Sequence, residues 1–138
     1  MLITRETDYA IRILRALTGG KQMTAPDICK KELLPQQFIY KILKKLQRSG
    51  LIAITRGKDG GCRLIADLQT VTLYDLMKIM ESDKSISACT RPDYQCAWRQ
   101  KYGKPCRVHQ NLQQIQDKLD EELKSAQLSK ILSSDEFR

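Results

Sequence analysis

The fold of this chain is decided by residues 35–61, which read PQQFIYKILKKLQRSGLIAITRGKDGG. The first half of the stretch predicts a helix that ends near Gly50, because glycine is a common helix stop. The apolar residues of this helix recur at helical spacing and form one face: Phe38, Ile39, Ile42, Leu43 and Leu46. Residues 51–55 are rich in β-forming side chains and residues 56–61 have turn chemistry, so we expect a β-hairpin that returns through residues 62–66.

Two further helices are predicted before this stretch. Residues 5–17 repeat apolar side chains at helical spacing after the capping residue Thr4, and two glycines follow them. A second, short helix is expected to begin at Thr24, because a capping residue is followed there by Pro26 in the first turn. Three helices and then a basic hairpin is the order of a winged helix-turn-helix domain. We therefore expect a mainly α chain with a small β-hairpin wing.

The excess positive charge lies entirely in the amino-terminal half of the chain. The 138 residues have a net charge of +8 at pH 7. Residues 1–63 contain 13 Lys and Arg against 5 Asp and Glu, whereas residues 64–138 contain 11 of each sign. This asymmetry favours a polyanionic partner, because each phosphate that is neutralised releases condensed counterions. The alternative is a basic surface that only water covers.

A winged helix domain places its third helix in the major groove of DNA. Gln bonds adenine bidentately and Lys reaches guanine, so the expected base readers lie near the start of that helix: Gln36, Gln37, Tyr40 and Lys41. The expected phosphate ligands follow later in the same helix: Lys44, Lys45 and Arg48. Arg56 at the base of the wing and Lys58 at its tip are expected to reach into the minor groove. The alternative is an ordinary amphipathic surface helix.

The rest of the chain predicts a loop and a long helix. A short capped helix from Thr72 completes a DNA-binding domain over residues 1–81, and residues 82–105 are expected to form a cysteine-bearing sensor loop. Residues 106–132 are expected to form a dimerisation helix and a C-terminal segment. The apolar residues of that helix have nearly coiled-coil spacing: Val108, Leu112, Ile115, Leu119 and Leu123. One chain cannot easily bury this stripe, so we expect a homodimer that binds a palindromic operator in double-stranded DNA.

Soft metal ligands gather around the predicted loop. Cys89, Cys96, Cys106 and the only histidine, His109, follow the pattern C-x6-C-x9-C-x2-H. Thiolates are the preferred ligands of iron–sulfur clusters, and an imidazole can replace a thiolate. A zinc ion would accept the same donors, although structural zinc sites usually draw cysteines from closer pairs. A disulfide switch between Cys89 and Cys96 and cysteines without a function are the remaining alternatives.

Composition disfavours secretion, membrane insertion and catalysis. Five cysteines are an odd number for a disulfide framework, and Cys29 and Cys62 are expected to pack in the core. No apolar run reaches 18 residues, and the first residues lack the apolar stretch of a signal peptide. No nucleophile–base constellation is recognisable. We therefore expect a cytoplasmic protein that is not an enzyme.

Four short motifs stand in order along the chain: LIT at residues 2–4, TDYA at residues 7–10, LQRSGLI at residues 46–52 and RGKDGG at residues 56–61. The cysteine loop before a long helix follows them. With these features the chain resembles the iron–sulfur cluster regulator family of winged helix-turn-helix transcription regulators.

The resemblance implies that Cys89, Cys96 and Cys106 hold an iron–sulfur cluster of the 2Fe–2S or the 4Fe–4S type. In the cluster-biogenesis branch the fourth ligand is a histidine at the position of His109. In the nitric-oxide-sensing branch it is an aspartate from the partner's first helix, at the position of Asp8. The implied protein is a transcription regulator, such as a repressor, whose operator affinity responds to iron, redox state or nitric oxide. The alternative is a cluster-independent repressor of the same fold that responds to a metabolite, a partner protein or thiol oxidation.

Overall fold

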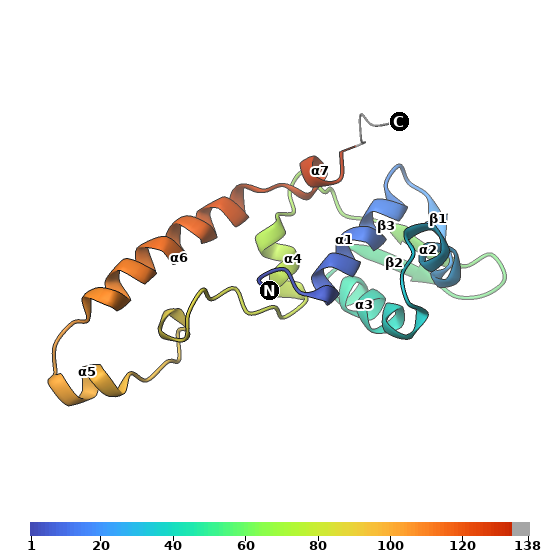
Figure 1. Cartoon of the computed structure of the whole chain (residues 1–138). Coiled ribbons are helices and arrows are strands. Elements are labelled where there is room, and N and C mark those ends of the chain that lie inside the picture. Colours follow the sequence, from blue (N-terminus) through green and yellow to red (C-terminus); the bar gives the residue numbers. More distant parts are fainter. Residues whose placement is uncertain (134–138) are drawn as a thin grey trace.

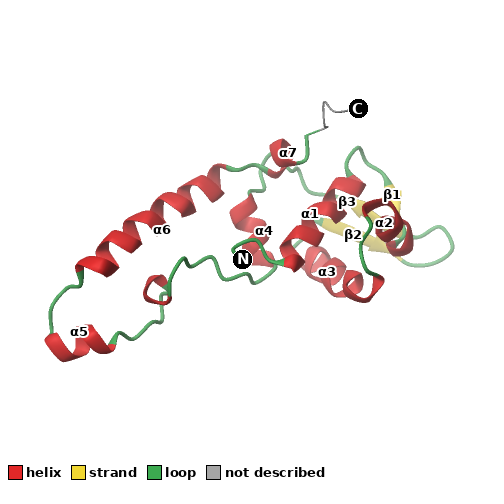
Figure 2. Ribbon diagram, in the orientation of Figure 1, coloured by secondary structure: helices red, strands yellow, loops and turns green. Residues whose placement is uncertain are grey.

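The computed structural model describes residues 1–133, which form a mainly helical chain with one small sheet (Figures 1 and 2). In chain order, the elements are α1 (Arg5–Leu17), β1 (Gln22–Met23), α2 (Ala25–Glu32), α3 (Gln36–Arg48), β2 (Ile52–Thr55), β3 (Gly61–Leu64), α4 (Leu73–Ile79), η1 (Ala88–Thr90), α5 (Ala97–Tyr102), α6 (Arg107–Ser125) and α7 (Leu128–Ile131). Helices α1 to α3 followed by a β-hairpin confirm the predicted winged helix-turn-helix fold.

The caps that the sequence predicts are present at the first two helices. The hydroxyl of Thr4 accepts a hydrogen bond from the Thr7 amide at 3.2 Å, and the hydroxyl of Thr24 accepts one from the Asp27 amide at 3.3 Å. Helix α2 is followed by its C-cap residue Leu33, which has a left-handed backbone with φ 57° and leaves 85% of its surface exposed. This conformation makes the sharp turn that separates α2 from α3.

The sheet has three antiparallel strands in the order β1-β3-β2. Strands β2 and β3 form the predicted wing, with Thr55 opposite Gly61 at the end of the ladder. Gly60 is required in the turn, because a Cβ there would collide with the Thr55 carbonyl oxygen. Strand β1 is an addition that the sequence did not predict, and the Gln22 side chain donates a hydrogen bond to the Asp59 carbonyl oxygen at 2.7 Å. Strand β1 therefore stabilises the wing by pairing with β3 on the side away from β2.

The core lies between α1, α2, α3, the sheet and α4. Its largest fully buried side chains are Ile13, Leu14, Leu17, Ile28, Ile39, Ile42, Leu46, Ile52, Leu76, Met77 and Leu128. Phe38 differs from the prediction, because it is 42% exposed at the margin of the α3 apolar face and its ring lies near that of Tyr9. Leu128 enters this core from α7, far along the chain from the other members.

The chain leaves the winged-helix domain after α4 and returns to it at α7. Helix α6 and the segment before it extend away from the domain (Figure 1). Residues 82–127 form this excursion. Its returning end is held beside the start of α4, where the Leu73 amide donates to the Ala126 carbonyl oxygen at 2.8 Å and the Leu128 amide donates to the Val71 carbonyl oxygen at 2.9 Å. The cysteine loop, residues 82–105, contains the short helices η1 and α5, whereas the sequence predicted only loop structure there. The described part of the chain includes no helix with the length and apolar character needed to cross a membrane.

Candidate nucleic-acid interface and cysteine loop

The outward face of α3 carries a row of polar and basic side chains. The helix buries one stripe, made of Ile39, Ile42, Leu43 and Leu46. The opposite face leaves these predicted DNA-binding residues exposed: Gln36, Gln37, Tyr40, Lys41, Lys44 and Arg48. The N-terminal end of the helix presents the amides and the tyrosine, and the later turns present most of the cations. This order matches base contacts near the helix start and phosphate contacts farther along.

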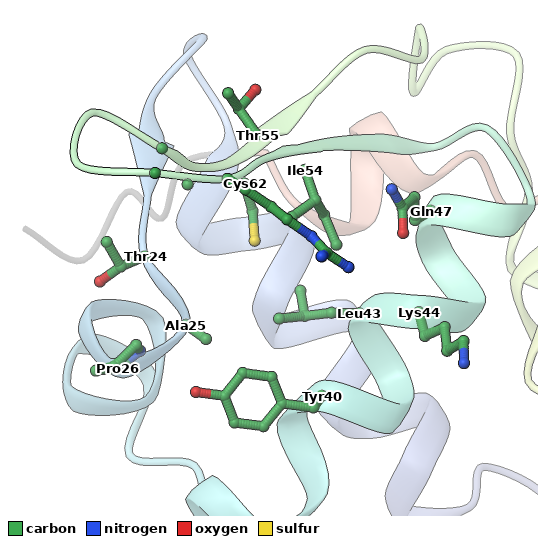
Figure 3. Close-up of a pocket in the computed structure, with 14 residues that line it drawn as sticks. Thr24, Ala25, Pro26, Tyr40, Leu43, Lys44, Gln47, Ile54, Thr55 and Cys62 are labelled. Carbon is green, nitrogen blue, oxygen red and sulfur yellow. The ribbon is translucent and has the colours of Figure 1, made fainter.

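A groove separates this face from the wing. It encloses about 690 Å³ and is lined by the start of α2, the outer side of α3 and both wing strands. Figure 3 shows Tyr40 reaching across the groove from α3, with its hydroxyl end directed toward Pro26 of α2. Arg56 lines the groove at the base of the wing, and both Arg56 and Lys58 are exposed. Eight of the nine predicted DNA-binding residues are thus exposed on α3 or the wing, and because of that prediction we call this surface the DNA-binding face.

Lys45 is the ninth residue, and its environment is different. Its side chain is only 18% exposed, and its ammonium group lies 3.2 Å from a carboxylate oxygen of Glu6 and 3.7 Å from one of Glu81. It also lies 3.5 Å from the Met80 carbonyl oxygen. Lys45 therefore joins α3 to α1 and to the end of α4.

The three cysteines of the predicted metal site lie at different places in the excursion. Cys89 lies in η1, Cys96 directly precedes α5 and Cys106 caps the start of α6. All three are free thiols and partly buried. Among residues 1–133, no three side chains of His, Cys, Asp or Glu lie close enough together to hold a metal ion.

The donor chemistry around these cysteines nevertheless suits an iron–sulfur cluster. The His109 amide donates to the Cys106 sulfur at 3.5 Å, and the Nδ1 atom of His109 is buried without a hydrogen-bond partner. The backbone amide of Arg99, in the first turn of α5, lowers the pKa of the Cys96 thiol, which favours the thiolate that binds metals. Three thiols and an imidazole with a free buried nitrogen fit the ligand preferences of a cluster. Their positions do not form a complete site within one chain.

Asp8, the other predicted ligand, lies on the winged-helix domain. It is in α1, and its carboxylate pairs with Arg12 one turn later at 3.3 Å. It is partly exposed and does not belong to any group of metal-binding side chains within the described residues.

The two remaining cysteines are buried in the winged-helix domain. Cys29 is 5% exposed and Cys62 is 3% exposed, and burial raises the pKa of both thiols. Both belong to the apolar core, as the sequence predicted.

Gln116 anchors the cysteine loop to α6, and sequence reasoning missed it. This residue is 5% exposed. Its Oε1 accepts hydrogen bonds from the Ile86 amide at 2.7 Å and the Thr90 hydroxyl at 3.2 Å, and its Nε2 donates to the Lys84 carbonyl oxygen at 2.9 Å. The sequence offers little signal for this role, because three other glutamines stand nearby in the same helix.

Helix α6 leaves part of its apolar stripe uncovered. Val108 is 66% exposed and Ile115 is 54% exposed, whereas Leu123 is buried near the winged-helix domain. Val108 and Ile115 are about two turns apart, so these two exposed side chains lie on one face of the helix.

Comparison with protein families finds one family model that matches nearly the whole chain. The family model Rrf2, described as an iron-dependent transcriptional regulator, matches residues 3–134. The chain is also similar to the protein aau3 of Rhizobium meliloti (strain 1021), with 35% identity over 91 residues. That match covers 64% of this chain and 59% of aau3.

Solved structures of similar fold include two regulators. CymR of B. subtilis, described as the global cysteine regulator of that organism, has a TM-score of 0.70 and 22% identity, and the match covers 96% of this chain and 98% of CymR. IscR of T. potens has a TM-score of 0.65 and 15% identity, and the match covers 94% of this chain and 84% of IscR. At these identities the likenesses show a shared fold.

Proposed function

The chain belongs to the Rrf2 family of iron-dependent transcriptional regulators, and from that premise we propose that an iron–sulfur cluster sets its affinity for a palindromic operator as a homodimer. Members of this family are DNA-binding transcription regulators and not enzymes. The observation that carries the proposal is the open DNA-binding face of α3 and the wing, in a chain whose three predicted cluster cysteines lie outside that domain.

In this proposal the start of α3 reads bases and its later turns bind phosphates. Gln36, Gln37, Tyr40 and Lys41 would contact base edges in the major groove, while Lys44 and Arg48 would contact the backbone. Arg56 and Lys58 would follow the wing into the minor groove. The exposure of all eight side chains supports their contact with DNA.

The DNA roles are tested by selecting a duplex from a random pool with the wild-type protein. Replacing Gln37 with Ala should cost about 1–3 kcal/mol and relax the base preference at one position of each half-site. Replacing Arg48 with Ala should weaken binding to every sequence equally. Unchanged sequence preference in the Gln37 variant would remove that residue from the base readers.

The ligands of the cluster would come from the excursion. Cys89, Cys96 and Cys106 would supply thiolates, and His109 or Asp8 of the partner subunit would supply the fourth donor. When bound, the cluster would act as the sensor, because its presence and oxidation state depend on iron, oxidants and nitric oxide. The residues of this chain would respond through the cysteine loop, which Gln116 ties to α6. A coupling of about 1–3 kcal/mol between the loop and the DNA-binding face would change operator affinity about 5- to 150-fold.

The cluster is tested on protein purified without oxygen. Visible absorption with iron and sulfide content should show a cluster in the wild type and its loss in Cys106→Ala. The fourth ligand is identified by comparing His109→Ala and Asp8→Ala with Asp93→Ala, an exposed carboxylate of the loop that serves as the control. Iron-free wild-type protein with full operator response would overturn this half of the proposal.

The second candidate is a regulator of the same fold that works without a cluster. It is favoured by the separation of the three free thiols and by the fold shared with the cysteine regulator CymR. Its signal would be a metabolite, a partner protein or oxidation of these thiols. Replacing Cys89, Cys96 and Cys106 together with Ser should leave the response to a metabolite or a partner intact and abolish a response to oxidants.

A further inference from the structure

The recognition helix has one cation that faces the interior. Lys44 and Lys45 are neighbours in α3, yet Lys44 is exposed on the groove side and Lys45 is 18% exposed. The Lys45 ammonium has three oxygen neighbours: Glu6 at 3.2 Å, Glu81 at 3.7 Å and the Met80 carbonyl at 3.5 Å. A move of Lys45 to a DNA phosphate would leave Glu6 with only Lys41, which lies 3.8 Å away.

Two of the oxygens around Lys45 belong to Met80 and Glu81, where the chain leaves the winged-helix domain. Glu81 has a left-handed backbone with φ 58°, which is unfavourable for a residue with a side chain. Its neighbour Ser82 is buried, and the Ser82 hydroxyl lies 2.8 Å from the Thr7 hydroxyl and 3.3 Å from that of Thr4. Residues 80–82 are thus fixed to both α1 and α3 in a strained turn.

The same turn leads directly to the first cysteine. Beyond Ser82, the Asp83 carboxylate pairs with Arg91 at 2.6 Å, and Gln116 of α6 holds the backbone at Lys84 and Ile86. The Ser87 hydroxyl then lies 3.3 Å from the Cys89 sulfur. Polar contacts therefore follow the chain from Lys45 to Cys89.

We infer that Lys45 is a positioning residue that couples α3 to the start of the cysteine loop, and that it does not bind a DNA phosphate. The inference rests on the proposed function as a DNA-binding regulator, but it does not depend on which signal the loop receives. A change in the loop that moves residues 80–82 would move the oxygens that hold Lys45, and with them the middle of α3. By reciprocity, DNA bound to α3 would stabilise the loop.

The first test separates coupling from phosphate binding. Lys45→Met keeps the apolar stem and removes the charge, and Lys44→Met is the matched control on the exposed side. Binding of a duplex selected by the wild type is measured over a range of salt concentrations. The slope of log K against log salt should fall in magnitude by about 0.9 in Lys44→Met, as expected for one lost phosphate contact, and stay unchanged in Lys45→Met.

The second test follows the loop by hydrogen exchange with peptide-resolved mass spectrometry. In free protein, amides of residues 82–90 should exchange faster in Lys45→Met than in wild type or Lys44→Met. Saturating DNA should slow this exchange about fivefold or more in wild type and less than twofold in Lys45→Met. Lys45→Arg should show the wild-type pattern of exchange. Glu6→Gln should reduce the protection of residues 82–90, and it is the second variant if Lys45→Met does not fold.

Two results would overturn the inference. One is a slope that falls by about 0.9 in Lys45→Met, because that would make Lys45 a phosphate ligand. The other is exchange at residues 82–90 that does not differ between Lys45→Met and Lys44→Met in free protein. Failure of the wild type to bind any duplex would instead reject the proposed function. Hydrogen exchange in free protein would still show whether Lys45 stabilises residues 82–90.

Discussion

At the residue scale, side chains of the same type differ in pKa or in partners because their surroundings differ. Cys29 and Cys62 lie in the apolar core, where desolvation raises the pKa of each thiol. Cys96 lies at the start of α5, where the Arg99 amide lowers its pKa. The lysine pair in α3 divides in the same way, because Lys44 faces solvent and Lys45 faces two carboxylates.

The thiols should therefore react in a fixed order. At pH 8 and with no metal bound, iodoacetamide should modify Cys96 well before Cys29 and Cys62, because only the thiolate reacts. The reactivity of Cys96 should also persist to lower pH than that of a free cysteine. Peptide mapping by mass spectrometry over time gives the order, and unfolded protein in urea is the control in which the difference should disappear. Equal rates in the folded protein would contradict the assignment.

Gln116 should matter more than its neighbours on α6. Gln116→Leu removes the partners of the Ile86 amide and the Lys84 carbonyl oxygen, so we expect the free energy of unfolding to fall by about 1–3 kcal/mol. Urea unfolding measures this change. Gln114→Leu, at an exposed position two residues earlier, is the control and should stay within about 0.5 kcal/mol of wild type. A smaller effect in Gln116→Leu than in the control would show that the loop is held by other contacts.

At the element scale, the sequence predicts the structures whose signals are local. Caps and helical periodicity predicted α1, α2, α3, α4 and α6. The cap residues Thr4, Thr24 and Thr72 each accept a hydrogen bond from a backbone amide in the first turn of the helix that follows. Strand β1 was missed because two residues carry no periodicity. Helix α5 was missed because its six residues are too few to establish a helical periodicity.

The candidate site was predictable in chemistry and not in geometry. The exposed residues of α3 followed from the position of its apolar stripe, since a helix fixes which side chains share a face. The inward direction of Lys45 did not, because Glu6 and Glu81 are distant in sequence and only packing brings them to it. Likewise, the cysteine spacing identifies donors, but a loop without a core of its own does not specify how they meet.

The turn between α2 and α3 offers a test of backbone strain. Leu33 has φ 57° and is 85% exposed, so Leu33→Gly should relieve the left-handed strain with little loss of packing. We expect the free energy of unfolding to rise by about 0.5–1 kcal/mol after the entropy cost of glycine. Urea unfolding measures it. Lys31→Gly, inside α2, is the control and should lower stability by about 1 kcal/mol.

At the scale of the whole molecule, the excursion is attached to the winged-helix domain at both ends and exposes an apolar face between them. The contacts of Glu81 and Ser82 hold its start at the winged-helix domain, and the backbone bonds of Leu73 and Leu128 hold its returning end. Between these ends, α6 exposes Val108 and Ile115 on one face. The proposed homodimer would bury this stripe without altering the DNA-binding face.

A charge on the stripe should separate the subunits. Ile115→Lys would remove about 1.5 kcal/mol or more of apolar burial from each subunit, so the dissociation constant of the dimer should rise at least about 100-fold. Analytical ultracentrifugation measures it. Gln110→Lys adds the same charge on another side of α6 and should leave the dimer intact. If Ile115→Lys sediments as wild type does, the subunits associate through a different surface.

The position of Leu128 has a consequence for synthesis of the protein. A ribosome makes the chain from its amino terminus, and the three helices and the wing leave it well before the side chain that fills their core from α7. The cysteine loop and α6 are therefore translated before the DNA-binding core is complete. We expect copies interrupted within that segment to be less stable and to be degraded more readily than full copies. The copies that persist to compete for DNA would then be those that already carry the cysteines.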